Sequence, residues 1–413
     1  MTCLLNLLIL ENRKKLKVEN YIFGQTNELI FMDIFKHLTV LYLVFSLIVV
    51  FFGGGMVTNA ASDRNNIVRV VAHTPDEAQR GLARGCAIVE RGRALIALEC
   101  PGAVATALGF KEDIKVFAQD AGANTQIGAD LVHAGGNTGQ GRTVVVLDTG
   151  YNYNHPELAL SFGGGLDFVN NDSDPMDDNG HGSHVAGLIT ADGVNSRARG
   201  AAPDTTVVAG KVLNASGSGY FSTVANAIYW AVDGPDGVFG TADDFGADAI
   251  NMSLGTGAPY LYNKSFCDNV LPALTAAIQY AVNRGVVVVV AAGNSGSAGV
   301  SLPGCISYST TVGAVNKSDK IANFSGRGPA VDIVAPGVNL LSSWLGSEYI
   351  YASGTSMATP VVSAVVALVR QAHPAYTQAQ VETALFSAAK DLGKAGKDTT
   401  FGWGRVRANI AVR

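Results

Sequence analysis

The sequence predicts a three-layer α/β protein with a central parallel sheet, preceded by a small α+β domain. From about residue 140 onward, continuous apolar runs alternate with helical patterns. Such runs are typical of parallel strands that are buried on both faces. Residues 66–118 instead alternate short strand-like and helix-like segments, and a polar stretch at 118–126 follows them. We expect this stretch to be an exposed linker that a protease could cut.

The composition is that of a large globular chain. Of the 413 residues 48% are hydrophobic and only 15% are charged, which allows an extensive core. The 48 glycines follow no short period, so a collagen-like or low-complexity chain is excluded. The net charge is -5 and the basic residues are scattered, so the sequence shows no basic cluster of the kind that binds nucleic acid. We expect no nucleic-acid partner.

The N-terminal region contains one strongly apolar segment, at residues 38–52. It has the length of a signal-peptide core and is short for a membrane span, and small residues at 58–61 offer a cleavage region. We therefore expect a signal peptide at 32–60, a translation start at Met32, a doubtful leader at 1–31 and a secreted product. An uncleaved membrane anchor that leaves the protein facing outside stays open as the alternative.

The expected elements follow one another in two groups. In the small domain Thr74 and Pro75 are typical of the cap and first turn of a helix. In the large domain the apolar runs are expected to be strands whose carboxyl ends carry the ligand-binding residues. The small domain is expected to have strands at 67–72, 87–99 and 114–118 and helices at 74–85 and 103–110; the large domain, strands at 143–148, 205–213, 247–254, 285–293 and 330–337 and helices at 181–188, 221–233, 270–285 and 356–373.

Three of these element ends carry the residue types of nucleophilic catalysis. Asp148 ends a strand, and His181 and Ser356 each open a helix. A serine hydroxyl needs an imidazole to take its proton, and the imidazole needs a carboxylate to fix its tautomer. Taken singly, each residue would be an ordinary turn aspartate, buried histidine or helix cap. The combination predicts a catalytic triad.

The surrounding motifs resemble one family. The segments VVVLDTG, NGHGSHVAG, NMSLG, VVAAGNSG and GTSMATP resemble the subtilase family, peptidase family S8, over about residues 125–413. The resemblance implies a subtilisin-like fold for the catalytic domain at 121–413 and a serine endopeptidase that acts on proteins or peptides through an acyl-enzyme. No cofactor is implied for the chemistry, and we expect a monomer.

The resemblance also implies a substrate site. Asn294 would form the oxyanion hole with the backbone N–H of Ser356. An extended peptide would add as a strand to an edge made by Ser253, Leu254 and Gly255, beside a primary pocket that Gly293 keeps open. Residues 301–305 hold no acidic side chain, so an apolar or broad side-chain preference is expected.

A structural calcium ion is the one metal that the resemblance suggests. Glu157 matches a position where the family often supplies a ligand, but Val194 stands where a ligand asparagine would be expected. The acidic segments 171–180 and 233–248 are alternative calcium sites or plain solvated loops. His184 shares a helix face with His181, but without a third ligand we expect it to be structural.

Four cysteines, Cys86, Cys100, Cys267 and Cys305, remain outside the doubtful leader, and disulfides are plausible in an exported chain. Cys267 and Cys305 flank the strand that leads to Asn294 and are candidates for a bridge that would brace the substrate pocket, although sequence leaves the pairing open.

Residues 61–120 match the family's inhibitory propeptide in size, position and strand–helix–strand pattern. This predicts a self-processing zymogen that is inhibited by its own propeptide. The alternative is a non-catalytic or permanently inhibited binding module, but every residue of the predicted triad is present.

Overall fold

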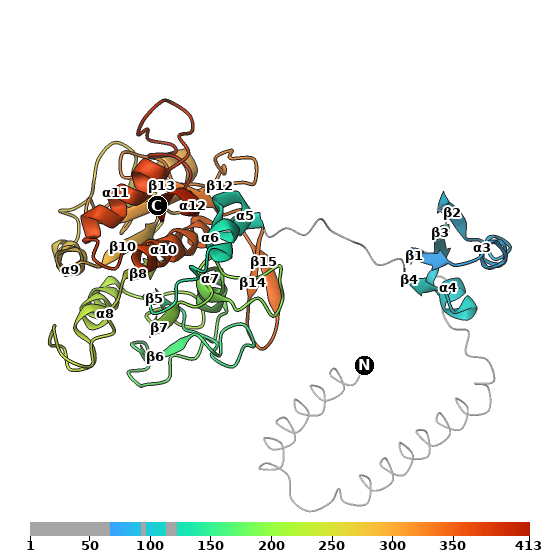
Figure 1. Ribbon diagram of the computed structural model, residues 1–413, viewed down its shortest axis with the longest axis horizontal. Coiled ribbons are helices and arrows are strands. Elements are labelled where there is room, and N and C mark those ends of the chain that lie inside the picture. The colour runs from blue at the N-terminus through green and yellow to red at the C-terminus, as the bar shows by residue number, and fades with distance from the viewer. Residues whose placement is uncertain (1–66, 92–95, 113–121) are drawn as a thin grey trace, which may run out of the picture. The chain divides into compact units, whose positions relative to one another are not determined.

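The computed structural model describes residues 67–91, 96–112 and 122–413 (Figure 1). The chain divides into two compact units, Met1–Val116 and Phe117–Arg413. The expected leader and signal peptide lie outside the described residues. Within the described part, none of the helices has the length and apolar character needed to cross a membrane.

The N-terminal unit is an antiparallel sheet with two helices. The strand order is β2-β3-β1-β4, so β1 and β2 run parallel on either side of β3 and are joined through a helix. Thr74 caps that helix as predicted, because its hydroxyl accepts from the Glu77 N–H. The elements are β1 Ile67–Ala72, α3 Pro75–Leu82, β2 Ala87–Arg91, β3 Ile96–Pro101, α4 Gly102–Leu108 and β4 Lys111–Glu112.

Two expectations for this unit need correction or stay open. The single strand expected at 87–99 is wrong, since the chain reverses between β2 and β3 and the two pair antiparallel. The strand expected at 114–118 lies outside the described residues. A disulfide joins Cys86 to Cys100 beside the buried Leu98, so the small core is covalently closed.

The C-terminal unit contains a seven-stranded parallel sheet in the order β13-β12-β10-β8-β5-β7-β6. Its central strands are continuous apolar runs because both of their faces are covered, and every residue of β10 is buried. The strands are β5 Thr143–Asp148, β6 Phe162–Asp167, β7 Thr206–Lys211, β8 Ala249–Met252, β10 Val287–Ala291, β12 Thr310–Val315 and β13 Ile333–Pro336.

Helices cover both faces of this sheet, which confirms the predicted three-layer fold (Figure 1). Val144 and Val146 of β5 enter one core, and Val145 and Leu147 enter the other, as the alternation of a strand requires. The first core is covered by α5 Gly122–Ile127, α6 Ala129–Ala134, α7 His181–Thr190, α10 Thr355–Ala372, α11 Gln378–Ala388 and α12 Ala408–Ala411, and the second by α8 Phe221–Asp233 and α9 Pro272–Asn283.

The linker expected at 118–126 is wrong from Gly122 onward, and residues 118–121 lie outside the described part of the chain. Residues from Gly122 onward form α5, whose Ile127 is fully buried in the core of the C-terminal unit. The Asn124 amide donates to the carbonyls of Arg199 and Gly200. The polar composition of this stretch concealed the helix, because its anchors are one amide and one aliphatic side chain.

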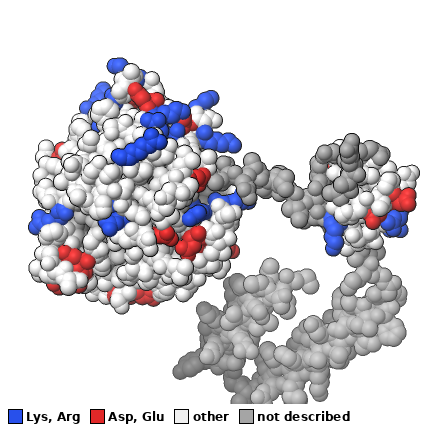
Figure 2. Space-filling view, viewed as in Figure 1, with Lys and Arg blue, Asp and Glu red and all other residues white. Residues whose placement is uncertain are grey.

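Smaller elements complete the C-terminal unit. Two short antiparallel pairs lie outside the main sheet, β9 with β11 and β14 with β15. On the face drawn in Figure 2, acidic and basic side chains are interspersed among larger uncharged areas. The smaller elements are β9 Leu261–Tyr262, η2 Gly296–Ala298, β11 Val300–Ser301, β14 Leu340–Ser343 and β15 Tyr349–Ala352.

Candidate active site

The carboxyl edge of the sheet brings two of the predicted catalytic residues into direct contact. Asp148 is the last residue of β5 and His181 is the first residue of α7. His181 Nδ1 lies 2.7 Å from Asp148 Oδ1. The aspartate side chain is fully buried, while 27% of the histidine side chain is exposed. This pair can hold the imidazole in one tautomer, with Nε2 free to accept a proton.

The electrostatics of the pair favour a protonated ring. Burial of the imidazole disfavours its charged form. The charge of Asp148 and the hydrogen bond to it outweigh that effect, and the charge of Asp177 acts in the same direction, so the pKa of His181 is raised above its ordinary value. A histidine of this kind is a strong proton acceptor.

Asp177 is a buried residue that the sequence analysis did not single out. Its Oδ1 accepts from the Thr149 hydroxyl at 2.9 Å and from the Gly180 N–H at 2.9 Å. Its Oδ2 accepts from the N–H and the hydroxyl of Ser183, in the first turn of α7. Burial opposes its ionisation, but these hydrogen bonds outweigh it and lower the pKa of Asp177. The carboxylate thereby fixes the helix end that carries His181.

Lys211 supports the same region from the next strand. Its ammonium group is almost fully buried and donates to the carbonyls of Thr149 and Leu213. It also pairs with Asp178 at 2.6 Å. The segment that follows Asp148 is therefore held by a buried charge as well as by the sheet.

Ser356, the second residue of α10, lies in the same cleft as His181. Its hydroxyl donates to the carbonyl of Ser253 at 3.1 Å. In return the Ser253 hydroxyl donates to the Ser356 carbonyl at 2.9 Å. That carbonyl is available because its helical partner four residues on is Pro360, which has no N–H.

Asn294 follows β10 and is held at one end of its amide. Its Oδ1 accepts from the N–H of Thr355 at 2.9 Å and from the hydroxyl of Thr355 at 3.1 Å. A methyl group added to Gly354 would lie 3.6 Å from both Asn294 Nδ2 and Ser356 N. The two donors expected to form an oxyanion hole therefore both lie beside Gly354.

The cleft has a volume of about 630 Å³, and its described lining carries no charged side chain other than His181. Gly255, Gly293 and Ser301 all line this cleft, and we call the part of it that they border the primary pocket. A Cβ at either glycine would come within 2.4 Å of Ser301 Oγ. The Ser301 hydroxyl is buried and has no hydrogen-bond partner among the described residues. The side-chain preference expected from residues 301–305 rested on their lack of acidic side chains and left this hydroxyl out.

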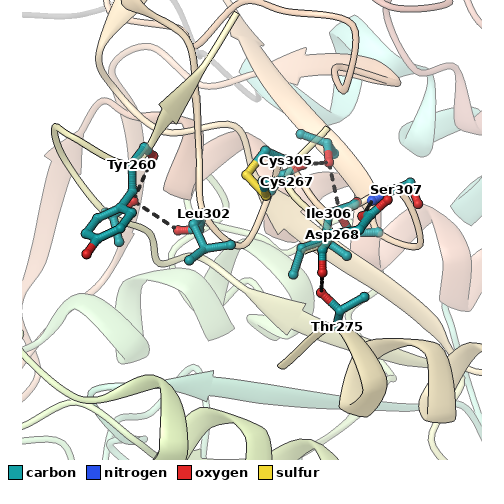
Figure 3. Close-up of a disulfide and its surroundings, with 12 residues drawn as sticks. Tyr260, Cys267, Asp268, Thr275, Leu302, Cys305, Ile306 and Ser307 are labelled. Carbon is teal, nitrogen blue, oxygen red and sulfur yellow. Dashed lines mark hydrogen bonds between the residues drawn. A yellow bond between two sulfur atoms is a disulfide. The ribbon is translucent and has the colours of Figure 1, made fainter. Parts of the chain in front are cut away.

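The bridge between Cys267 and Cys305 is present (Figure 3). The Cys305 N–H donates to the Ser301 carbonyl at 3.1 Å, and the Cys267 N–H donates to the Cys305 carbonyl at 3.0 Å. Asp268 adds a hydrogen bond from the Ser307 N–H at 2.7 Å. These contacts connect the loop that carries Cys267 to Ser301, which lines the primary pocket.

His184 and the acidic segments, which the sequence offered as possible metal ligands besides Glu157, do not form a metal site. His184 is fully buried, and its Nε2 lies 3.2 Å from the carbonyls of Leu340 and Ile350. Burial lowers the pKa of His184 to about 4, so the ring is neutral near pH 7. No group of three or more His, Cys, Asp or Glu suited to a metal occurs in the described part of the chain, and this covers the acidic segments 171–180 and 233–248.

A parallel α/β sheet whose carboxyl edge carries a buried aspartate–histidine pair, with a serine lining the same cleft, is typical of a serine hydrolase. The model of the subtilase family matches residues 139–404. The chain belongs to this family and is a subtilisin-like serine endopeptidase.

Curated relatives agree with this family. A thermophilic serine proteinase of Bacillus sp. (strain AK1) is 40% identical over 273 residues, which are 66% of this chain and 62% of the relative. Subtilisin Savinase of Lederbergia lenta is 38% identical over 289 residues, 70% of this chain and 97% of the relative. Subtilisin E of Bacillus subtilis (strain 168) is 38% identical over 293 residues, 69% of each chain.

Proposed function

We propose that this chain hydrolyses peptide bonds with Asp148, His181 and Ser356 as its catalytic triad. The observation that carries the proposal is the 2.7 Å contact between His181 Nδ1 and Asp148 Oδ1, at the rim of the cleft that Ser356 also lines. His181 takes the proton of the Ser356 hydroxyl through Nε2 while Asp148 stabilises the imidazolium. The serine oxygen attacks the peptide carbonyl carbon.

The tetrahedral intermediate needs donors for its negative oxygen. Asn294 Nδ2 and the N–H of Ser356 supply them, since the Thr355 contacts fix the opposite end of the Asn294 amide. His181 then protonates the leaving amine, and an acyl-enzyme remains. Water, deprotonated by His181, releases the acid and restores the serine.

Peptide substrates bind along Ser253, Leu254 and Gly255, which follow β8 and line the cleft. The substrate backbone adds to this edge as a strand, and one side chain enters the primary pocket. Because the lining lacks charge, the pocket takes uncharged side chains. No cofactor takes part in the chemistry.

The chain is made as a secreted zymogen. Residues 32–60 act as the signal peptide and residues 61–120 as the propeptide, which assists folding and inhibits the catalytic domain at 121–413. The separate core and disulfide of the N-terminal unit support this division. The maturation cut falls before Gly122, because Asn124 and Ile127 anchor α5 to the catalytic unit.

Labelling with a fluorophosphonate tests the nucleophile. The processed protein is expected to take up the label, and the Ser356→Ala variant is expected to take up none. Absence of label from folded, processed wild-type protein would instead favour the non-catalytic binding module. N-terminal sequencing of both secreted products locates the signal and propeptide cuts. If Ser356→Ala matures at the same bond, another protease performs the processing.

Substitution of Asn294 tests the oxyanion hole. In subtilisin the loss of such a donor costs about 10²–10³ in kcat, and we expect Asn294→Ala to lose activity on the same order with little change in KM. A variant with unchanged kcat would remove Asn294 from the proposed mechanism.

A further inference from the structure

Glu157 is a fully buried carboxylate with a complete set of hydrogen bonds. Its Oε2 accepts from the N–H groups of Gly193 at 2.7 Å and Val194 at 3.1 Å. Its Oε1 accepts from the Asn195 N–H at 2.6 Å and from the Tyr349 hydroxyl at 2.9 Å. We call the loop at residues 192–199, which follows α7, the clasped loop.

These contacts do not fit the calcium ion that the resemblance suggested at Glu157. A carboxylate has about four lone-pair positions, and four donors already occupy them. Calcium needs six to eight oxygen ligands, whereas the clasped loop turns three N–H hydrogens towards Glu157. Val194 holds the position of the expected asparagine ligand, and its side chain is 69% exposed.

One other carboxylate lies in this loop. Asp192 Oδ2 is buried without a hydrogen-bond partner among the described residues. One free oxygen beside an engaged carboxylate leaves most of a calcium shell unfilled.

We propose that Glu157 replaces the metal at this position: its carboxylate binds the backbone of the clasped loop directly and fastens it to Tyr349 of β15. Three segments far apart in sequence meet at this carboxylate. One of them continues directly from α7, the helix that begins with His181. The ordering of the clasped loop then requires Glu157 and not calcium.

Thermal unfolding with and without calcium tests this replacement. The full chain with Ser356→Ala, which cannot digest itself, is compared with the same chain carrying Glu157→Gln, each in excess EDTA and in millimolar calcium. A Gln amide would turn N–H hydrogens towards existing donors, so we expect Tm to fall by roughly 3–12 °C in EDTA. Any rise in Tm that calcium causes at other sites is expected to be equal in both chains.

Asp192→Asn is the matched control, since it neutralises the neighbouring carboxylate that binds none of these donors. Its Tm is expected to stay unchanged or to rise. The proposal is overturned if calcium raises the Tm of the parent chain and Glu157→Gln abolishes that rise, because Glu157 would then be a metal ligand.

Hydrogen exchange gives a readout that needs no variant. The amides of Gly193, Val194 and Asn195 are expected to exchange slowly in EDTA and at the same rate in calcium. Rapid exchange in EDTA that calcium slows would contradict the proposal even if Glu157→Gln failed to fold.

Discussion

Removing the disulfide between Cys267 and Cys305 should weaken the catalytic unit and its substrate pocket together. The bridge joins residues 38 positions apart. In the chain-entropy model, a loop of this length corresponds to about 4 kcal/mol of stability at 25 °C. We expect the double substitution Cys267→Ala with Cys305→Ala to lose stability on that order.

The same change should affect substrate binding more than chemistry. The Cys305 N–H donates to the carbonyl of Ser301, which lines the primary pocket, and the N–H of Thr256 donates to the neighbouring Leu302 carbonyl. The aspartate–histidine pair lies on β5 and α7, outside the bridged loop. Asn294 lies inside the loop, but Thr355 of α10 holds its side-chain amide from outside. KM for substrates with a large side chain in the primary pocket should therefore rise while kcat changes little.

Two measurements check these expectations. Denaturant unfolding under non-reducing conditions, in the Ser356→Ala background, gives the stability loss without self-digestion. Kinetics of the active double variant give KM and kcat separately. The matched control removes the Cys86–Cys100 bridge, which joins residues 14 positions apart, corresponds to about 3 kcal/mol and lies in the N-terminal unit.

A stability loss of less than about 1 kcal/mol in the bridge-free catalytic unit would contradict this prediction, since it is well under the value expected for the loop. An unchanged KM would separately contradict the link between this bridge and the primary pocket. The control variant should leave the KM of the mature enzyme unaltered.

Three further predictions concern single side chains. Asp177→Asn removes a charge that raises the pKa of His181, so the acid limb of the pH profile of kcat/KM should move to lower pH. Asp178→Asn is the control: the Asp178 carboxylate pairs with Lys211, and its loss should leave that limb in place. His184 has a folded pKa of about 4 and protonates more readily in the unfolded chain. The free energy of unfolding should accordingly fall by about 3 kcal/mol between pH 6.5 and pH 4, and His184→Gln should flatten this dependence in denaturation curves of an inactive background. Ser301→Ala removes the hydroxyl of the primary pocket that has no hydrogen-bond partner among the described residues. Because an unpaired buried hydroxyl costs about 1–3 kcal/mol, cleavage of a peptide library should shift roughly tenfold from hydrogen-bonding towards aliphatic side chains. A library profile that does not change would show that the hydroxyl takes no part in selection.

The fold class was predictable because local pattern carries it. The valine-rich run of β10 is apolar throughout since helices cover both faces, and Thr74 marks a helix start through its own side chain. The linker prediction is wrong from Gly122 onward because long-range contacts, and not the local pattern, order this segment. Nothing in the short α5 sequence indicates that Asn124 will bond to carbonyls 75 and 76 residues away.

Residue types and their order can be read from the sequence: an aspartate after a buried strand, a histidine and a serine at helix starts, and an asparagine after the valine-rich strand β10. Which polar groups face each buried side chain depends on the tertiary structure. Glu157 looks like a calcium ligand in sequence, but donors 36 to 192 residues away surround it. The reason is physical, because the partners of a buried carboxylate are fixed by how distant backbone segments converge, and no local pattern encodes that convergence.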